Sequence, residues 1–318
     1  MSTATSYHDI AKQIILQVLA EKVQFIHPII GKGAVNQVYL VETNISEYIV
    51  RMNESPAALP IYEKEKWCIE QATLYGIPGP EVLTIGKIDQ VAYMIQTKVK
   101  GINGGDSSLD TKTIWKSLGK YTKRIHSIPV NGYGEILSDP ANRTFTASTH
   151  EGFDGSWHGF IRYNLESLTE NDPFISLGVW LKKDIKIVKQ KFENLLDIPF
   201  SFGLVHGDLS LKNTIVDDTG HVTVLDWGCA EAHLTPYWDI VQLRKSHLDI
   251  GKPTQTEFDA FLQGYGFSQL EFLTIQPMLE TLLLLDACDK MRWAIDCKPD
   301  CIPSFANYTK KVWRRNSQ

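Results

Sequence analysis

The chain has 318 residues, of which 43% are hydrophobic and 22% are charged, and a formal net charge of −5 at pH 7. This length and composition are typical of a globular protein with room for two domains, and they exclude a disordered chain. The acidic balance argues against a nucleic-acid-binding protein, because such proteins are usually basic. We interpret the basic cluster KKVWRR near the end of the sequence as the solvated face of a helix.

The cysteines and the apolar runs indicate the compartment. The five cysteines are odd in number and unevenly spaced, and no CxxC pair occurs, so a reducing environment is a simpler interpretation than a disulfide framework. The opening residues MSTATSYHDIAKQ lack an apolar signal core. No apolar run approaches the roughly 20 residues that a membrane span needs. We therefore expect a cytoplasmic protein without membrane or nucleic-acid partners, while the oligomeric state stays open.

The first hundred residues are predicted to be mostly sheet. An apolar stripe predicts a helix over residues 7–20. A second helix is predicted over 60–75, because Gly76 and Pro78 are typical helix stops. The expected strands are VQFIHPII, VNQVYLVET, YIVRM, VLTIG and VAYMIQTKV.

The rest of the chain is predicted to be mainly helical. Residues 131–156 are rich in Gly, Ser, Thr and Asn and are expected to form a long loop. The expected helices lie at 112–128, 157–169 and 177–195, and three or four more follow before the end of the sequence.

The stretch HGDLSLKNTIVDDTGHVTVLDWG places carboxylates and an asparagine beside short apolar runs. Asn213 begins a predicted strand over 213–217, and Asp226 ends the next one, over 222–226. A turn between these strands would bring Asn213 and Asp226 together, with Asp208 facing the same cleft. One carboxylate that deprotonates a hydroxyl, and two oxygen ligands for Mg²⁺, suit phosphoryl transfer. A hairpin with turn-capping Asp residues is the alternative, which the joint pattern HxDxxxxN and DxG disfavours.

This stretch resembles the aminoglycoside phosphotransferase family, whose relatives include choline kinases and protein kinases. The 18-residue spacing between Asp208 and Asp226 is similar to the spacing of the two catalytic Asp residues in kinase-like folds. The resemblance implies that Asp208 is the catalytic base and that Asn213 and Asp226 hold Mg²⁺. It also implies that His206 supports the catalytic loop and that the buried Asp239 anchors it.

The resemblance implies a fold as well. We expect an α+β, two-lobed protein kinase-like fold, with a small, mostly antiparallel β N-terminal lobe and a larger, mainly α-helical C-terminal lobe. The composition changes near residues 101–108. We therefore predict a nucleotide-binding lobe over 1–100 and a catalytic and substrate-binding lobe over 101–318.

The stretch GKGAVNQVYLV lies between two predicted strands. Glycines at such a turn allow backbone N–H groups to approach phosphates without a Cβ clash. The resemblance implies that Gly31, Gly33 and Asn36 belong to a glycine-rich loop over the nucleotide. An ordinary hairpin turn without a ligand is the alternative.

Two further segments are expected to bind the donor nucleotide, ATP or GTP. The resemblance implies that Arg51 contacts the α- and β-phosphates and that Glu65 holds Arg51 by an ion pair, with Glu63 as the rival partner. Arg51 as a surface charge is the alternative. The segment YMIQTKVKG resembles the kinase hinge, in which the backbone of Thr97 and Val99 would pair with a purine edge. An interior strand without a ligand is the alternative.

The acceptor is expected to be small. Asp226 and Asp239 are only 13 residues apart, which leaves no room for a segment that docks a peptide. Four residues fall on one face of a predicted helix, namely Asp286, Asp289, Trp293 and Asp296. Carboxylates beside an indole suit an ammonium group, although a solvated helix face is the alternative.

The sequence therefore predicts a phosphotransferase that moves the γ-phosphate of ATP or GTP to a hydroxyl of a small, amine-bearing molecule, with Mg²⁺ as cofactor. Aminoglycoside-like antibiotics, amino alcohols and amino sugars are all candidate acceptors. The alternatives are a catalytically silent nucleotide-binding scaffold and a protein kinase. A role in antibiotic resistance and a role in metabolism are both compatible with these residues.

Overall fold

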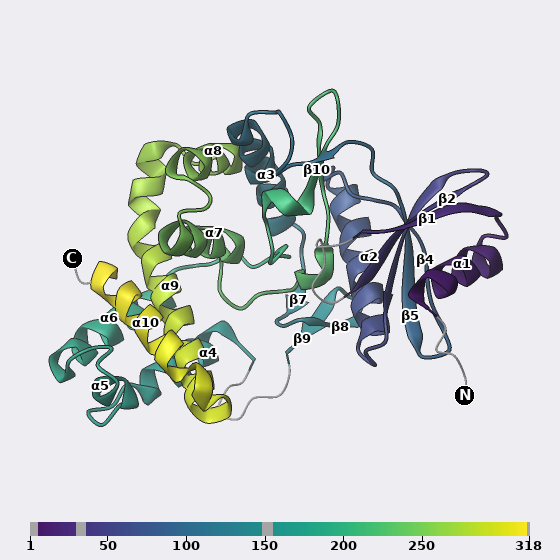
Figure 1. Ribbon diagram of the computed structural model, residues 1–318. Coiled ribbons are helices and arrows are strands. Elements are labelled where there is room, and N and C mark those ends of the chain that lie inside the picture. The colour runs from purple at the N-terminus through teal and green to yellow at the C-terminus, as the bar shows by residue number, and fades with distance from the viewer. Residues whose placement is uncertain (1–5, 30–35, 148–154, 317–318) are drawn as a thin grey trace. The chain divides into compact units, whose positions relative to one another are not determined.

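The computed structural model describes residues 6–29, 36–147 and 155–316 (Figure 1). The contacts within the chain divide it into two compact units. The first unit comprises residues 1–114 and 208–230, and the second comprises residues 115–207 and 231–318. The stretch around Asp208 and Asp226 thus belongs to the same unit as the N-terminal strands. The single boundary near residue 100 stays a prediction about the lobes.

The first unit is built on a five-stranded antiparallel sheet with the order β1-β2-β3-β5-β4. Burial alternates along β3, so that Tyr48, Val50 and Met52 point into one core while Arg51 points to the opposite face. The strands are β1 (Val23–Pro28), β2 (Gln37–Thr43), β3 (Glu47–Asn53), β4 (Val82–Ile88) and β5 (Val91–Thr97).

A helix covers each face of this sheet (Figure 1). Helix α1 (Tyr7–Val18) packs its buried residues against Val50 and Met52. Helix α2 (Ala58–Leu74) packs Tyr62 against Ala92 and Met94 on the other face. Because Arg51 shares that second face, the alternation of β3 directs its side chain toward α2.

The predicted hairpin near Asn213 is present and gains a third strand. Strands β10 (Thr214–Val216) and β11 (Val222–Val224) are antiparallel, and β6 (Ile102–Asn103) pairs with β10. The Nδ2 of Asn103 also donates a hydrogen bond to the Lys212 carbonyl at 2.7 Å. Strand β6 was not predicted, because two residues are too short for a periodic signal.

The second unit is mainly helical. Helix α3 (Thr111–His126) begins in the first unit and continues into the second, and the long α9 packs against α10. The other helices are α4 (Trp157–Ser167), α5 (Pro173–Ser176), α6 (Ile185–Leu196), α7 (Trp238–Ile250), α8 (Gln255–Tyr265), α9 (Gln269–Cys297) and α10 (Ile302–Asn316). Short 3₁₀ turns are η1 (Lys182–Asp184), η2 (Leu211–Asn213), η3 (Trp227–Cys229) and η4 (Pro299–Cys301).

Two predictions for this unit were wrong. A single helix over 177–195 does not form, because Gly178 adopts φ +66° after α5, and α6 begins only at Ile185. The loop predicted over 131–156 contains a small sheet around the buried Phe145. Its strands are β7 (Asn131–Gly132), β8 (Ile136–Asp139) and β9 (Thr144–Thr146). They are too short to show an alternating pattern in the sequence.

Within the described ranges, the structure contains no helix with the length and apolarity that a bilayer crossing requires.

Candidate functional site

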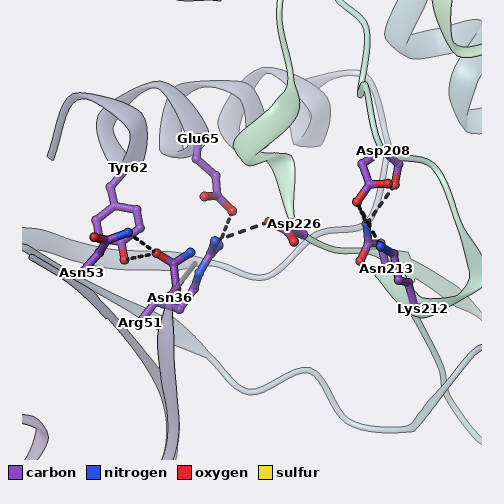
Figure 2. A network of polar contacts seen from close by, with 9 residues as sticks. All are labelled: Asn36, Arg51, Asn53, Tyr62, Glu65, Asp208, Lys212, Asn213 and Asp226. Carbon is purple, nitrogen blue, oxygen red and sulfur yellow. Dashed lines mark hydrogen bonds and ion pairs between the residues drawn. The ribbon is translucent and has the colours of Figure 1, made fainter. Parts of the chain in front are cut away.

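The loop that carries Asp208 folds back on itself. The Nδ2 of Asn213 donates hydrogen bonds to the Asp208 backbone carbonyl and to its Oδ2, both at 2.8 Å (Figure 2). The 3₁₀ turn Leu211–Asn213 makes this possible, because it reverses the chain between the two residues. The Lys212 Nζ lies 3.5 Å from Asp208 Oδ2 but is 70% exposed, so this ion pair contributes little. The hydrogen bonds from Asn213 therefore fix the direction of the Asp208 carboxylate.

Asp226 lies just after β11 in an unusual backbone conformation. Its φ is +58°, in the left-handed region that side chains other than glycine seldom adopt. The preceding Leu225 N–H donates to the Asn213 carbonyl at 2.9 Å, which joins the two predicted metal ligands through their backbones. A Cβ at Gly228 would lie 3.6 Å from Asp226 Oδ1 and 3.7 Å from Glu65 Oε2. Glycine there leaves space beside both carboxylates.

Arg51 lies between two carboxylates that are distant in sequence (Figure 2). Its guanidinium donates a short hydrogen bond to Glu65 Oε1, and its other nitrogen lies 3.4 Å from Asp226 Oδ1. Burial by itself would lower the pKa of Arg51, but the charges of Glu65 and Asp226 raise it above its ordinary value. Glu65 is fully buried, whereas Glu63 is exposed, so Glu65 is the ion-pair partner.

Hydrogen bonds determine the orientation of the Asn36 side chain. The Ser55 backbone N–H donates to Asn53 Oδ1 at 2.8 Å, so the Asn53 amide nitrogen must point the other way. That nitrogen donates to Asn36 Oδ1 at 3.0 Å, and the Tyr62 hydroxyl donates to the same oxygen at 3.0 Å. Neither of these hydrogen bonds uses the Asn36 Nδ2, and Asn36 lines the cavity of this unit. Gly31 and Gly33 lie outside the described residues.

Asn36, Arg51, Asn213 and Asp226 line one cavity of about 220 Å³ in the first unit, whereas Asp208 is not among its described lining residues. Its walls are apolar, and its polar groups include Asn36, Arg51, Asn213 and Asp226, a composition typical of ligand sites. The apolar walls include Val38, Ile49, Ile215 and Leu225.

The predicted hinge lies at the edge of the same cavity. Thr97 and Val99 both line it, as does the buried Gln96. The Thr97 N–H already donates to the Glu81 carbonyl at 2.9 Å. Among the described residues, the backbone groups of Val99 have no hydrogen-bond partner. Val99 therefore has a backbone donor and acceptor to offer a ligand.

The predicted ligand set suits a hard divalent ion. Because its nitrogen is bonded to Asp208, Asn213 turns its Oδ1 away as an acceptor, and no described residue uses that oxygen. The Asp226 side chain is 46% exposed and can supply a second oxygen. The described residues contain no cluster of three or more His, Cys, Asp or Glu that could hold a metal alone. Two protein oxygens fit Mg²⁺, which usually completes its shell with water and phosphate.

A second network, in the second unit, surrounds the residues that precede Asp208. The buried Asp239 accepts from the backbone N–H groups of His206 at 3.0 Å and Gly207 at 2.8 Å. The His126 Nε2 lies 3.1 Å from the same carboxylate, and its Nδ1 lies 3.0 Å from the Tyr265 hydroxyl. Burial would raise the pKa of Asp239, but the hydrogen bond from His126 and the nearby positive charge lower it.

Sequence reasoning missed His126. It ends α3 without any motif that marks it, and its contact with Asp239 joins residues 113 positions apart. His206, predicted to support the loop, is fully buried beside this network. The network fixes the backbone of His206 and Gly207, which directly precede Asp208 in the sequence.

The predicted acceptor residues line a cavity of about 380 Å³ in the second unit. Asp286 is buried and pairs with Lys290 at 3.0 Å, so the interpretation of this face as fully solvated was wrong for Asp286. The i,i+4 spacing on α9 places the Lys290 ammonium beside the Asp286 carboxylate, and this pairing compensates the buried charge. Asp289 and the half-exposed Trp293 also line the cavity. Glu135 and Glu231 add carboxylates that sequence reasoning did not identify.

Comparisons with known proteins identify the family and the fold. The sequence pattern of the phosphotransferase enzyme family matches residues 28–273. Aminoglycoside phosphotransferase APH(4)-Ia is 15% identical, with a TM-score of 0.64, over 97% of this chain and 99% of that one. Spectinomycin phosphotransferase APH(9)-Ia, solved with ADP and spectinomycin, is 14% identical, with a TM-score of 0.54, over 99% of this chain and 91% of that one. No curated protein sequence matches the chain.

A third similar structure is a ternary complex of a thermostable mutant of APH(4)-Ia with AMP-PNP and hygromycin B. It is 16% identical, with a TM-score of 0.63, over 96% of this chain and 97% of that one. The likeness in fold extends over nearly the whole chain. Together with the antiparallel sheet of the first unit and the helices of the second, it confirms the predicted α+β, protein kinase-like fold.

We expect the ion pair between Arg51 and Glu65 to stabilise the first unit. Glu65→Gln should lower the free energy of unfolding by about 3 kcal/mol, because it leaves a buried guanidinium with a neutral partner. Glu63→Gln is the matched control on the same helix, and its effect should be within about 0.5 kcal/mol. Urea unfolding measures both, and equal effects of the two substitutions would contradict the assignment.

We expect His126 to lower the pH at which the second unit unfolds in acid. Since the folded-state pKa of Asp239 is lowered, its stabilising effect is complete above its unfolded value of about 4 and is lost as the pH falls through the folded value. His126→Ala should raise that folded-state pKa and shift acid unfolding to higher pH. His126→Gln keeps a donor and should stay closer to the original protein. Acid titration of the circular dichroism signal tests this, and an unchanged midpoint in His126→Ala would refute it.

Proposed function

Because the chain belongs to the phosphotransferase enzyme family, we propose that it transfers the γ-phosphate of ATP or GTP to a hydroxyl group of a small, amine-bearing molecule. The observation that carries this proposal is the orientation of Asp208 by Asn213, together with the shared cavity of Asn213, Asp226 and Arg51. Phosphoryl transfer passes through a loose transition state, so catalysis depends on fixed charges rather than on covalent chemistry.

Asp208 is the proposed base. Its Oδ2 accepts from Asn213, which leaves the carboxylate in a fixed direction and 39% exposed. It can then accept the proton of the acceptor hydroxyl as the oxygen attacks phosphorus. Asn213 Oδ1 and the Asp226 carboxylate are the proposed ligands of Mg²⁺. Mg²⁺ held by these two side chains would supply positive charge to compensate the phosphates of the nucleotide.

The nucleotide is proposed to lie in the cavity of the first unit. Arg51 can contact the phosphates because Glu65 holds its guanidinium beside Asp226. Asn36 can donate through the Nδ2 that Asn53 and Tyr62 leave unused. The Val99 backbone can pair with the purine edge, and the Thr97 backbone can contribute its carbonyl. Gly31 and Gly33 stay predictions for the phosphate-binding loop.

The acceptor is proposed to bind in the acidic cavity of the second unit. Among the described residues, its lining includes the carboxylates of Glu135, Glu231, Asp286 and Asp289 and one ammonium, that of Lys290. This excess of negative charge favours a cationic molecule. Trp293 offers an indole face to an ammonium group. Lys290 pairs with Asp286, and Asp289 lines the same cavity one position before Lys290 on α9, so both predicted aspartates are proposed to contribute negative charge there.

Two other functions are weaker. A catalytically silent scaffold would not need the hydrogen bond that orients Asp208, nor the free oxygen of Asn213. A protein kinase would need a longer segment between Asp226 and Asp239 than the 13 positions available here. Phosphate incorporated into polypeptides, rather than into small molecules, would favour the protein kinase.

The roles of the two aspartates can be separated by substitution. Asp208→Asn should reduce kcat by at least about a hundredfold while leaving MgATP affinity nearly unchanged, because this carboxylate addresses the acceptor. Asp226→Asn should instead weaken Mg²⁺-dependent nucleotide binding. Asp218→Asn, at the exposed turn of the same hairpin, is the control and should change neither.

Turnover is measured by phosphate transfer from ATP and GTP across a panel of aminoglycosides, amino sugars and amino alcohols, and binding by calorimetry. Full turnover in Asp208→Asn would remove this residue from the role of base. MgATP binding without any phosphorylated product across the panel would favour the silent scaffold.

The charge of the acceptor cavity can be tested on one helix. Asp289→Asn should raise KM for amine-bearing acceptors by about three- to tenfold, as expected for a partly exposed charge pair. Neutral polyols should show little change. Asp296→Asn is the matched control, because Asp296 is exposed on α9 and does not line the cavity. Equal effects on charged and neutral acceptors would reject the proposed role of Asp289.

A further inference from the structure

A histidine in the acidic cavity has surroundings that determine its chemical state. His233 stacks on Trp238, with ring centroids 3.8 Å apart and planes within 4°. The Lys290 ammonium lies 4.9 Å from the Trp238 ring centroid and pairs with Asp286. The imidazole is therefore held in place by an aromatic ring that a cation also contacts.

Hydrogen bonding shows which nitrogen of His233 carries the proton. The Thr235 backbone N–H donates to His233 Nδ1 at 2.9 Å, whereas the Thr235 carbonyl lies farther away, at 3.4 Å. A nitrogen that accepts a hydrogen bond cannot carry a proton, so the proton of the neutral ring is on Nε2.

The ring also stays neutral. Burial and the nearby Lys290 charge lower the pKa of His233 to about 3, although the Thr235 backbone and Asp239 act in the opposite direction. A neutral imidazole with a defined tautomer is a hydrogen-bond donor at Nε2 at any pH above this range. Among the described residues, no group accepts that hydrogen bond.

The spacing between Glu231 and the His233 Nε2–H leaves room for one ligand oxygen atom that contacts both groups. Its Oε1 is 3.9 Å from His233 Nε2, which is too long for a direct hydrogen bond. Both residues line the acidic cavity. We propose that His233 and Glu231 together bind one hydroxyl group of the acceptor and make the cavity selective for hydroxylated amines. This inference rests on the proposed function of that cavity.

The chemistry of the pair explains the selectivity. A hydroxyl oxygen can accept from the His233 N–H while its own proton is donated to the Glu231 carboxylate. An ammonium group has only donors, so it cannot accept from Nε2–H. An ether oxygen can accept but cannot donate to Glu231. The carboxylates of the cavity thus attract the charge of the ligand, whereas His233 distinguishes the oxygen-bearing molecule from a simple amine.

The state of His233 can be measured without any turnover. In ¹⁵N-labelled protein, the ring nitrogens should show a protonated Nε2 and an unprotonated Nδ1, with no titration between pH 5 and 8. A ring that carries its proton on Nδ1, or that titrates near the ordinary value of about 6.5, would overturn the proposal.

Binding selectivity can be measured with two matched diamines, 2-deoxystreptamine and cis-1,3-diaminocyclohexane. They share the ring and the two ammonium groups, and only the first carries hydroxyls. The full-length protein should bind 2-deoxystreptamine about three- to tenfold more tightly, as one net hydrogen bond would give. His233→Phe keeps a ring on Trp238 and should lose this preference, whereas His233→Gln keeps a donor and should retain part of it.

The outcomes separate this inference from the proposed function. Equal binding of the two diamines by the original protein, or no binding of either, would overturn the proposal that His233 and Glu231 bind a hydroxyl group. An equal loss of affinity for both diamines in His233→Phe would also overturn it, because that pattern indicates a structural effect. Phosphoryl transfer in the acceptor panel is measured separately. Activity without this binding preference would support the proposed function but contradict the proposed role of His233 and Glu231.

Discussion

The ion pairing of Arg51 holds the candidate nucleotide site together. One guanidinium joins β3 to Glu65 on α2 and to Asp226 after β11. Glu65 is 14 positions from Arg51 in the sequence and Asp226 is 175 positions away, and a buried cation needs its partners in place. Arg51 can meet both only because the alternation of β3 directs it to the face of the sheet that α2 covers. The packing of α2 on the sheet, through Tyr62, thus also determines where the charges of the site lie.

The remaining polar side chains of the site are also oriented by their neighbours, through hydrogen bonds that fix the direction of each side chain. Asn213 directs the Asp208 carboxylate, and Asn53 and Tyr62 direct the Asn36 amide. In the second unit, backbone N–H groups and His126 hold Asp239. Such preorganisation matters for phosphoryl transfer, because the protein contributes positions and charges rather than bonds.

Much of the fold could be predicted because its signals are local. The alternation of β2 and β3, the apolar stripe of α1 and the hairpin of β10 and β11 all appear within short windows. The failures share a cause as well. Strand β6 pairs with the distant β10, and the strands of the small sheet around Phe145 pair with one another, but all of them have only two to four residues and show no periodic pattern. The break at Gly178 depends on a backbone conformation that the surrounding residues do not indicate.

The candidate site likewise contains residues that the sequence indicated and residues that only the tertiary structure revealed. The pattern around Asp208, Asn213 and Asp226 suggested a phosphoryl-transfer site, and the family resemblance added Arg51 as a candidate. Tertiary structure alone selected Glu65 over Glu63, brought His126 to Asp239, and paired Asp286 with Lys290. It also determined the tautomer of His233, through a backbone N–H two residues away. A sequence records which groups are present, whereas burial and hydrogen-bond geometry decide which of them are charged, which are neutral, and which face a ligand.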